Sequence, residues 1–192
     1  EGNGLLSRAK KELLPGELYL FISSGGTGQK ALRSIKETIN KTIDPKYHAQ
    51  VRYLVVDCAE NELRKLVNDK VFEPSEVMTV PYEGAHETIN PSSITSDRDA
   101  WVDRNLYSAT GGDAPGDKEG FKGDGAGAWR QPGRVRLTSP GGINVINKIR
   151  SVIDRTQHPA GTKLKVFFLC SVAGGTGSGT IVDLVYMTRH VL

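Results

Sequence analysis

Short apolar runs alternate with amphipathic helical patterns along most of the chain. The run ELYLFIS, from Glu17 to Ser23, has no internal polar alternation, which is typical of a strand buried on both faces. After it, apolar side chains recur at steps of three and four residues and predict a helix that begins just after Gly28: Ala31, Leu32, Ile35, Ile39 and Ile43. Asp44 and Pro45 end this helix.

The same order of strand and helix recurs further along the chain. A second strand is predicted from Val51 to Val56, with Asp57 at its end, and the helix after it carries Leu63, Leu66 and Val67. A later helical stripe precedes an apolar strand at residues 163–172; the stripe is Ile143, Ile146, Ile149, Val152 and Ile153. Strands separated by helices predict an α/β fold, a three-layer Rossmann-like parallel sheet with helices on both faces.

One stretch of the chain lacks this periodicity. Residues 74–123 are rich in Ser, Asp, Gly and Pro and predict a loop-rich insertion within a single domain that spans residues 1–192. Inside it, VMTVPY can form a short strand, which Pro81 restricts to a sheet edge or a strand end. An insertion of this kind is either functional or mobile.

Composition narrows the classes of partner. With 25 basic and 22 acidic residues the net charge is +3, and no block of like charges occurs, so we expect no nucleic-acid partner. No apolar run is long enough for a membrane span. The two cysteines, Cys58 and Cys170, each follow an apolar strand pattern and indicate small buried residues of a reducing, cytoplasmic compartment. The four histidines have no metal-ligand spacing, so we expect no protein metal site.

The candidate chemistry lies in glycine-rich segments that follow strands. SSGGTGQ (23–29) and AGGTGSG (173–179) share the order strand, GGTG, helix, and GAGAWRQPGR (125–134) is a third such segment. A helix that begins just after a strand presents free backbone N–H groups at the positive end of its dipole, where an anion is stabilised. Two such helix N-termini can converge on one polyphosphate, because ligands of parallel sheets bind beyond the carboxyl ends of the strands.

Two common nucleotide motifs fit less well. A P-loop requires a Gly-Lys pair followed by Ser or Thr, and neither GGTGQKA nor GGTGSGT supplies it. A dinucleotide fingerprint is satisfied by Gly26, Gly28 and Ala31, with Asp57 in the place of a ribose ligand, but this match leaves the other glycine segments unexplained.

In its glycine-rich motifs and in their order along the sequence, the chain resembles the tubulin and FtsZ family of GTP-binding proteins, in particular its divergent bacterial tubulin-like branch. AGGTGSG is similar to the family's GGGTGSG loop, with Ala173 in place of the first glycine. The resemblance implies nucleotide contacts in four segments: Gly25, Gly26, Thr27, Gly28 and Gln29; Asp57; Gly125, Ala126, Gly127 and Ala128; and Ala173, Gly174, Gly175, Thr176, Gly177 and Ser178.

The same resemblance implies a function. It predicts that GTP or GDP binds with Mg²⁺, that the third segment faces the terminal phosphate, and that copies of the protein associate through the nucleotide face into cytoskeletal filaments or a complex. The family's catalytic acidic loop comes from a neighbouring subunit and has no counterpart in these residues, so no catalytic residue is assigned. The chain resembles the N-terminal, phosphate-binding part of the family's GTPase domain, for which we expect weak binding and slow or no hydrolysis.

Several residues keep alternative roles. Thr176 and Ser178 can donate to phosphate oxygens or cap their helix. Asp57 can hold Mg²⁺ through water, bond the nucleotide, or cap the next helix. Arg130 and Arg134 can pair with a terminal phosphate or remain ordinary surface residues.

Two other classes of protein remain open. One is a Rossmann-type protein that binds NAD, in which Gly28 would be essential and AGGTGSG would not. The other is a non-catalytic tubulin-like scaffold, which would bind no nucleotide.

Overall fold

A single parallel sheet forms the centre of the molecule. The computed structural model describes residues 10–80, 130–138, 142–154 and 161–192. Its strands are β1 (Glu17–Ser24), β2 (Val51–Asp57), β3 (Val77–Thr79) and β4 (Lys163–Cys170), in the order β3-β2-β1-β4. All the pairings are parallel.

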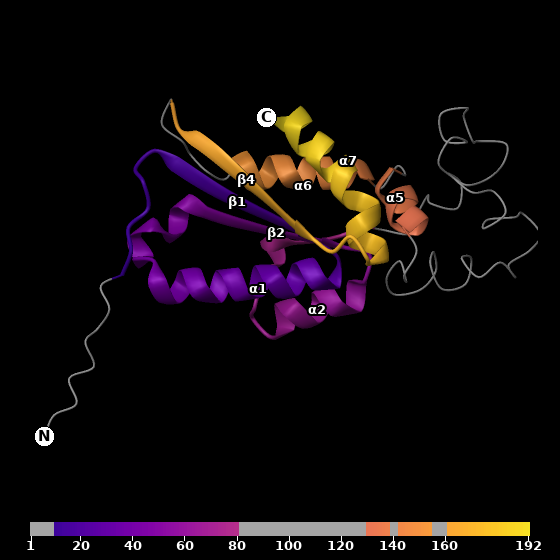
Figure 1. Cartoon of the computed structure of the whole chain (residues 1–192), viewed down its shortest axis with the longest axis horizontal. Coiled ribbons are helices and arrows are strands. Elements are labelled where there is room, and N and C mark those ends of the chain that lie inside the picture. Colours follow the sequence, from indigo (N-terminus) through magenta and orange to yellow (C-terminus); the bar gives the residue numbers. More distant parts are fainter. Residues whose placement is uncertain (1–9, 81–129, 139–141, 155–160) are drawn as a thin grey trace, which may run out of the picture.

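Helices cover both faces of this sheet (Figure 1). On one face lie α1 (Gly25–Thr42) and α2 (Glu60–Asn68), and on the other lie α6 (Ile143–Asp154) and α7 (Gly175–Val191). A further helix, α5 (Arg130–Thr138), packs beside α7, and short 3₁₀ helices span Pro45–Gln50 and Pro74–Glu76. The predicted three-layer α/β architecture is confirmed.

Side-chain alternation along the strands builds two cores. Because successive strand residues point to opposite faces, Leu20 and Ile22 of β1 face α6 and α7, whereas Tyr19 and Phe21 face α1. The first core is completed by Leu54, Val56, Val145, Ile149, Val152 and Leu184, and the second by Leu32, Val51, Tyr53, Val55, Leu63 and Phe72.

The path of the chain reverses beside β1. From β1 it moves outward through β2 to β3, and it then returns to place β4 on the other side of β1. The register pairs Ser24, the last residue of β1, with Cys170, the last residue of β4. Open α/β sheets bind ligands where the strand order reverses, outside the carboxyl ends of the strands. In this sheet that position lies between Ser24 and Cys170.

The burial of two predicted elements differs from expectation. Strand β4 ends at Cys170 and alternates between exposed and half-buried residues, because within the described sheet it has a partner on one side only. Its Phe167 is 43% exposed and stacks on Phe21, which in turn stacks on Tyr53. On α6, Ile143 is exposed and the buried stripe begins at Val145.

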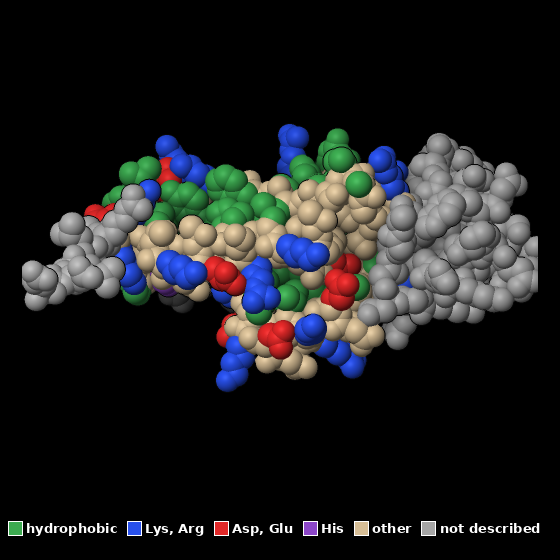
Figure 2. Space-filling view, turned by 60° about the horizontal axis from the view of Figure 1, so that its bottom comes forward, with side chains coloured by type: hydrophobic (Ala, Val, Ile, Leu, Met, Phe, Trp, Pro, Cys, Tyr) green, Lys and Arg blue, Asp and Glu red, His purple; other side chains and the backbone are tan. Residues whose placement is uncertain are grey.

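The start of the irregular stretch also forms regular structure. Of residues 74–123, the described part contains the 3₁₀ helix and β3, which is an edge strand as Pro81 led us to expect. On the side of the molecule in Figure 2, basic and acidic side chains are interspersed, and hydrophobic side chains form a separate area.

Candidate functional site

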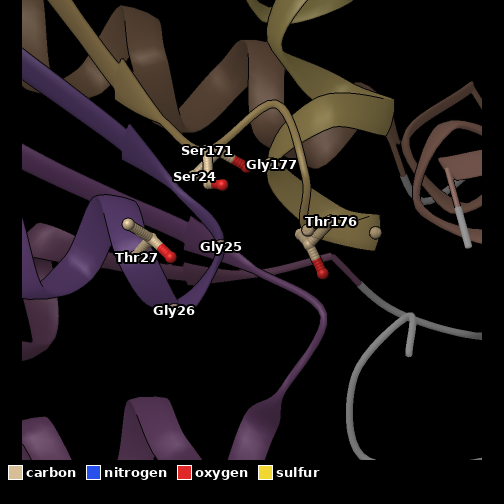
Figure 3. Close-up of a pocket in the computed structure, with 9 residues that line it drawn as sticks. Ser24, Gly25, Gly26, Thr27, Ser171, Thr176 and Gly177 are labelled. Atoms are coloured by element: carbon tan, nitrogen blue, oxygen red, sulfur yellow. The ribbon is translucent and has the colours of Figure 1, made fainter. Parts of the chain in front are cut away.

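A small polar pocket lies at the point where the strand order reverses. It has a volume of about 120 Å³ and is open to solvent. Figure 3 shows that it lies between the start of α1 and the segment that leads into α7. Its lining comes almost entirely from the two GGTG segments: Ser24, Gly25, Gly26, Thr27, Ser171, Gly174, Gly175, Thr176 and Gly177.

Two helices begin at this pocket, and neither N-terminus is capped by a side chain. The N-cap residues, Ser24 of α1 and Gly174 of α7, make no side-chain capping hydrogen bond, and neither first turn contains an acidic residue. The first N–H groups of a helix have no partner within it, and the dipole makes this end positive. The pocket therefore offers a concentration of donors and positive potential that suits a polyphosphate.

Both helices begin earlier than the sequence pattern indicated. The prediction that the first helix starts just after Gly28 is wrong, because α1 begins at Gly25, and α7 likewise begins at Gly175 inside AGGTGSG. Most of the glycines are thus part of helical first turns. Glycine has a poor intrinsic helix propensity, so the tertiary contacts of these turns must supply their stability.

Four of the glycines in the two segments are required by close backbone packing, and one of them is Gly179, on which a Cβ would collide with the Arg130 carbonyl of α5. Gly25 has a φ of +75°, and a Cβ on it would lie 2.8 Å from the Gly177 nitrogen. A Cβ on Gly177 would lie 2.9 Å from the Ser24 carbonyl oxygen, and one on Gly28 would collide with the Leu169 carbonyl. These contacts hold the two helix starts against each other and against the end of β4.

Two other glycines face open space. Among the described residues, a Cβ on Gly26 would meet only a Glu62 carboxylate oxygen at 3.7 Å, and one on Gly174 would meet nothing within 4 Å. Packing therefore does not explain the missing side chains at these two positions. Both residues line the pocket, so the missing side chains leave its backbone accessible to a ligand.

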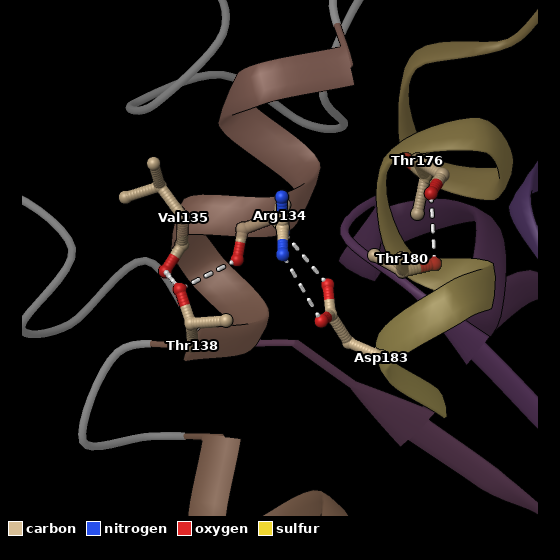
Figure 4. Close-up of polar contacts among 6 residues, drawn as sticks. All are labelled: Arg134, Val135, Thr138, Thr176, Thr180 and Asp183. Atoms are coloured by element: carbon tan, nitrogen blue, oxygen red, sulfur yellow. Dashed lines mark hydrogen bonds and ion pairs between the residues drawn. The ribbon is translucent and has the colours of Figure 1, made fainter. Parts of the chain in front are cut away.

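The hydroxyl groups around the pocket divide into bonded and free ones. The Ser24 and Thr180 hydroxyls are 2.7 Å apart, and Thr180 donates to the Thr176 carbonyl at 2.8 Å (Figure 4). Ser178 donates to the Gly174 carbonyl at 2.5 Å, which turns its hydroxyl back onto its own helix. The hydroxyl of Thr27 is exposed and has no protein partner among the residues that the structure describes. Thr27 is thus a free side-chain donor at the pocket, and Ser171, whose Oγ accepts from the Ala173 nitrogen at 3.2 Å, donates to no described residue and is a second one.

Asp57 lies behind the pocket and does not line it. It is 2% exposed, and its Oδ1 accepts hydrogen bonds from the backbone nitrogens of Cys58 at 2.7 Å and Ala59 at 3.1 Å. Its Oδ2 accepts a hydrogen bond from the amide of Gln29, which is also buried. Burial raises the pKa of Asp57, and the hydrogen bonds from Ala59, Cys58, Gln29 and Thr176 oppose that rise. These backbone bonds lie in the turn before α2, whose N-cap is Ala59 and has no side-chain cap hydrogen bond, so Asp57 does not cap that helix.

The third glycine segment is only partly described. Gly125, Ala126, Gly127 and Ala128 lie outside the described residues. The remainder is not a loop, because residues 130–138 form α5.

The guanidinium groups of α5 are engaged within the protein. Arg134 donates to Asp183 of α7 at 3.0 Å (Figure 4), and Arg130 donates to the Val172 carbonyl at 3.1 Å. Both guanidinium groups therefore already have a partner within the protein.

A comparison with protein-family models agrees with this geometry. The model of a family described as tubulin like matches residues 20–192, which include both GGTG segments and every described helix. The chain belongs to the tubulin-like family. A search of curated proteins and a search of solved structures each gave no match.

In this tubulin-like chain, the sequence did not lead us to four residues that either line the pocket or bond to residues around it. Ser24 and Ser171 line the pocket; Ser24 lies within SSGGTGQ just before its glycines, and Ser171 lies two residues before AGGTGSG, positions at strand ends that could have identified them. Thr180 and Asp183 lie one and two turns into α7 and gave no such signal. No described group of three metal-ligating side chains occurs, and none of the described helices is long and apolar enough to cross a membrane.

Proposed function

We propose that the pocket binds the phosphates of a guanine nucleotide, GTP or GDP. The observation that carries this proposal is the convergence of two helix N-termini, neither capped by a side chain, on one pocket at the reversal of strand order. Membership of the tubulin-like family supports the choice of a guanine nucleotide.

The roles of the lining residues follow from their geometry. Backbone N–H groups in the first turns of α1 and α7 donate to phosphate oxygens from two directions. Gly26 and Gly174 allow the phosphates to approach the backbone, and the Thr27 hydroxyl adds a side-chain donor. Mg²⁺ that arrives with the nucleotide would be held by phosphate oxygens and water, since none of the described lining residues carries a carboxylate.

Hydrolysis of GTP needs a group from elsewhere. The described residues that line the pocket are Gly, Ser and Thr, so among them no carboxylate or imidazole can orient a water against the terminal phosphate. We propose that a neighbouring subunit supplies this group when copies associate through the nucleotide face in the cytoplasm. The isolated chain is then a nucleotide-binding protein with slow or no turnover.

A calorimetric titration with GTP, GDP, ATP and NAD in the presence of Mg²⁺ tests this function. We expect heat of binding for GTP and GDP, weaker or no binding for ATP, and none for NAD. Binding of NAD alone would identify a Rossmann-type dinucleotide protein, and no binding of any of the four would identify a scaffold. Either of those results would overturn the proposal.

A further inference from the structure

We infer that Thr180 is a positioning residue that keeps the Ser24 hydroxyl from capping α1 and so leaves the first amides of that helix open to a ligand. Ser24 is the last residue of β1 and the N-cap of α1, and Thr180 lies in the second turn of α7. The consequence for nucleotide affinity rests on the proposed function, whereas the state of the Ser24 hydroxyl can be measured in the free protein.

The direction of the hydrogen bonds follows from the number of hydroxyl protons. The Ser24 and Thr180 oxygens are 2.7 Å apart, and both residues are fully buried. Thr180 has one hydroxyl proton, which it donates to the Thr176 carbonyl at 2.8 Å, because a carbonyl oxygen can only accept (Figure 4). Ser24 is therefore the donor in its contact with Thr180, and its hydroxyl is directed at a buried acceptor outside α1.

Ser24 is otherwise well suited to cap α1. Serine is among the preferred N-cap residues, and the φ of −134° and ψ of 134° at Ser24 are the extended angles of a typical N-cap. A capping serine oxygen accepts from the backbone N–H of the second or third helical residue, here Gly26 or Thr27. Ser24 makes no such bond, and both residues are exposed where they line the pocket. The contact with Thr180 thus explains an open helix N-terminus that follows a residue suited to closing it.

A simpler role of the hydroxyl pair would be to join the two helix starts, which also pack through Gly25 and Gly177. The two roles predict opposite changes when the Thr180 hydroxyl is removed. Loss of a link would loosen the start of α1 and accelerate amide exchange there. Release of Ser24 would instead let it cap the Gly26 or Thr27 amide, which slows exchange of that amide.

Thr180→Val removes the hydroxyl and keeps the shape of the side chain. It leaves the Ser24 hydroxyl buried without an acceptor, which is costly. We expect Ser24 to turn to the α1 amides, where its proton can meet water in the open pocket. Exchange of the Gly26 or Thr27 N–H with water, measured by NMR in the free protein, should then slow by about fivefold, the effect of one capping bond.

Three further variants complete the test. Ser24→Ala combined with Thr180→Val leaves no hydroxyl to cap α1 and none buried without a partner, so exchange should return to within about twofold of wild type. Thr180→Ser keeps the hydroxyl and should behave like the wild type. Thr188→Val is the matched control, because it removes another buried hydroxyl of α7, bonded to the Leu184 carbonyl one turn before it and away from the pocket.

The same variants are then titrated with GTP and Mg²⁺. A serine cap competes with phosphate oxygens for the α1 amides, so Thr180→Val should bind GTP about fivefold more weakly than the wild type. The double variant with Ser24→Ala should recover most of the lost affinity, because its amides are open again. Loosened helix starts would not be repaired by removing a second hydroxyl.

The exchange result decides the inference. Slower exchange at Gly26 or Thr27 in Thr180→Val, reversed in the double variant and absent in Thr188→Val, supports it. Faster or unchanged exchange at both amides overturns it and leaves the hydroxyl pair as a structural link. Slower exchange with unchanged GTP affinity, or no GTP binding by the wild type, would refute the use of the α1 amides in the proposed function and leave the inference about Ser24 standing.

Discussion

Gly25 and Gly177 lie so close together that a Cβ on Gly25 would come within 2.8 Å of the Gly177 nitrogen. These residues belong to two segments that are far apart in the sequence, and each opens a helix that points its N-terminus at the same pocket. The pocket-facing surfaces of α1 and α7 therefore form one continuous wall rather than two independent loops.

This contact predicts a loss of stability in Gly25→Ala. The substitution places a Cβ against backbone and forces a non-glycine residue to a φ of +75°, which together should lower the free energy of unfolding by about 1–3 kcal/mol. Urea unfolding followed by circular dichroism measures the change. An unchanged unfolding midpoint would show that the two helix starts do not touch as described.

Gly26→Ala should separate binding from stability. The added methyl meets no described atom closer than 3.7 Å and improves a helical position, so we expect the free energy of unfolding to stay level or rise by about 0.4–1 kcal/mol. The same methyl projects from a residue of the pocket lining and should weaken GTP binding.

Ser34→Ala is the matched control for that variant. Ser34 is an exposed residue of α1 away from the pocket, and its replacement improves helix propensity in the same way. It should bind GTP like the wild type. Equal affinities in all three proteins would place the ligand elsewhere.

The ion pair between Arg134 and Asp183 should stabilise the packing of α5 on α7. The pair is partly buried, with side-chain exposures of 38% and 19%, and Asp183→Asn should lower the free energy of unfolding by about 1 kcal/mol. Glu37→Gln serves as the comparison, because its exposed pair with Arg33 is worth no more than about 0.5 kcal/mol. Thermal unfolding measures how far each substitution lowers the melting temperature. Equal decreases for Asp183→Asn and Glu37→Gln would argue against a role for the contact between α5 and α7.

The raised pKa of Asp57 predicts a pH dependence of stability. Because its pKa is higher in the folded than in the unfolded chain, the folded state binds the proton more tightly. The resulting stabilisation is fully present below the unfolded pKa of about 3.9 and is lost as the pH rises through the folded value. Asp57→Asn removes this contribution, so relative to wild type the variant should gain stability as the pH rises above about 4. Urea unfolding at a series of pH values measures the free energy of unfolding of both proteins. Free energies that change with pH in the same way in wild type and Asp57→Asn would contradict the prediction.

The layered fold could be predicted because the relevant signals are local. The buried run from Glu17 and the helical stripe through Leu32 and Ile39 each report their own environment, and strands separated by helices leave few arrangements other than a parallel sheet. The position of the pocket followed from the same rule, since both GGTG segments come directly after strands.

The details of the site depend on contacts between residues that are far apart in the sequence. Helix α1 begins at Gly25 because its first turn packs on the start of α7. Helix propensity does not predict this packing. Arg134 and Asp183 are 49 residues apart, and nothing near Arg134 in sequence indicates that its guanidinium is already engaged. Asp57 was identified as important, but its burial behind the pocket depends on three elements meeting there.

The central claim is that a nucleotide's phosphates bind where the two helix starts converge, and Gly174→Val tests it most directly. Gly174 has extended backbone angles that suit valine, and a Cβ on it would meet no described residue within 4 Å, so the fold should be retained. Calorimetry with GTP and Mg²⁺ should then show at least about tenfold weaker binding than in the wild type, because the side chain fills the pocket. A folded Gly174→Val protein that binds GTP with wild-type affinity would contradict the claim.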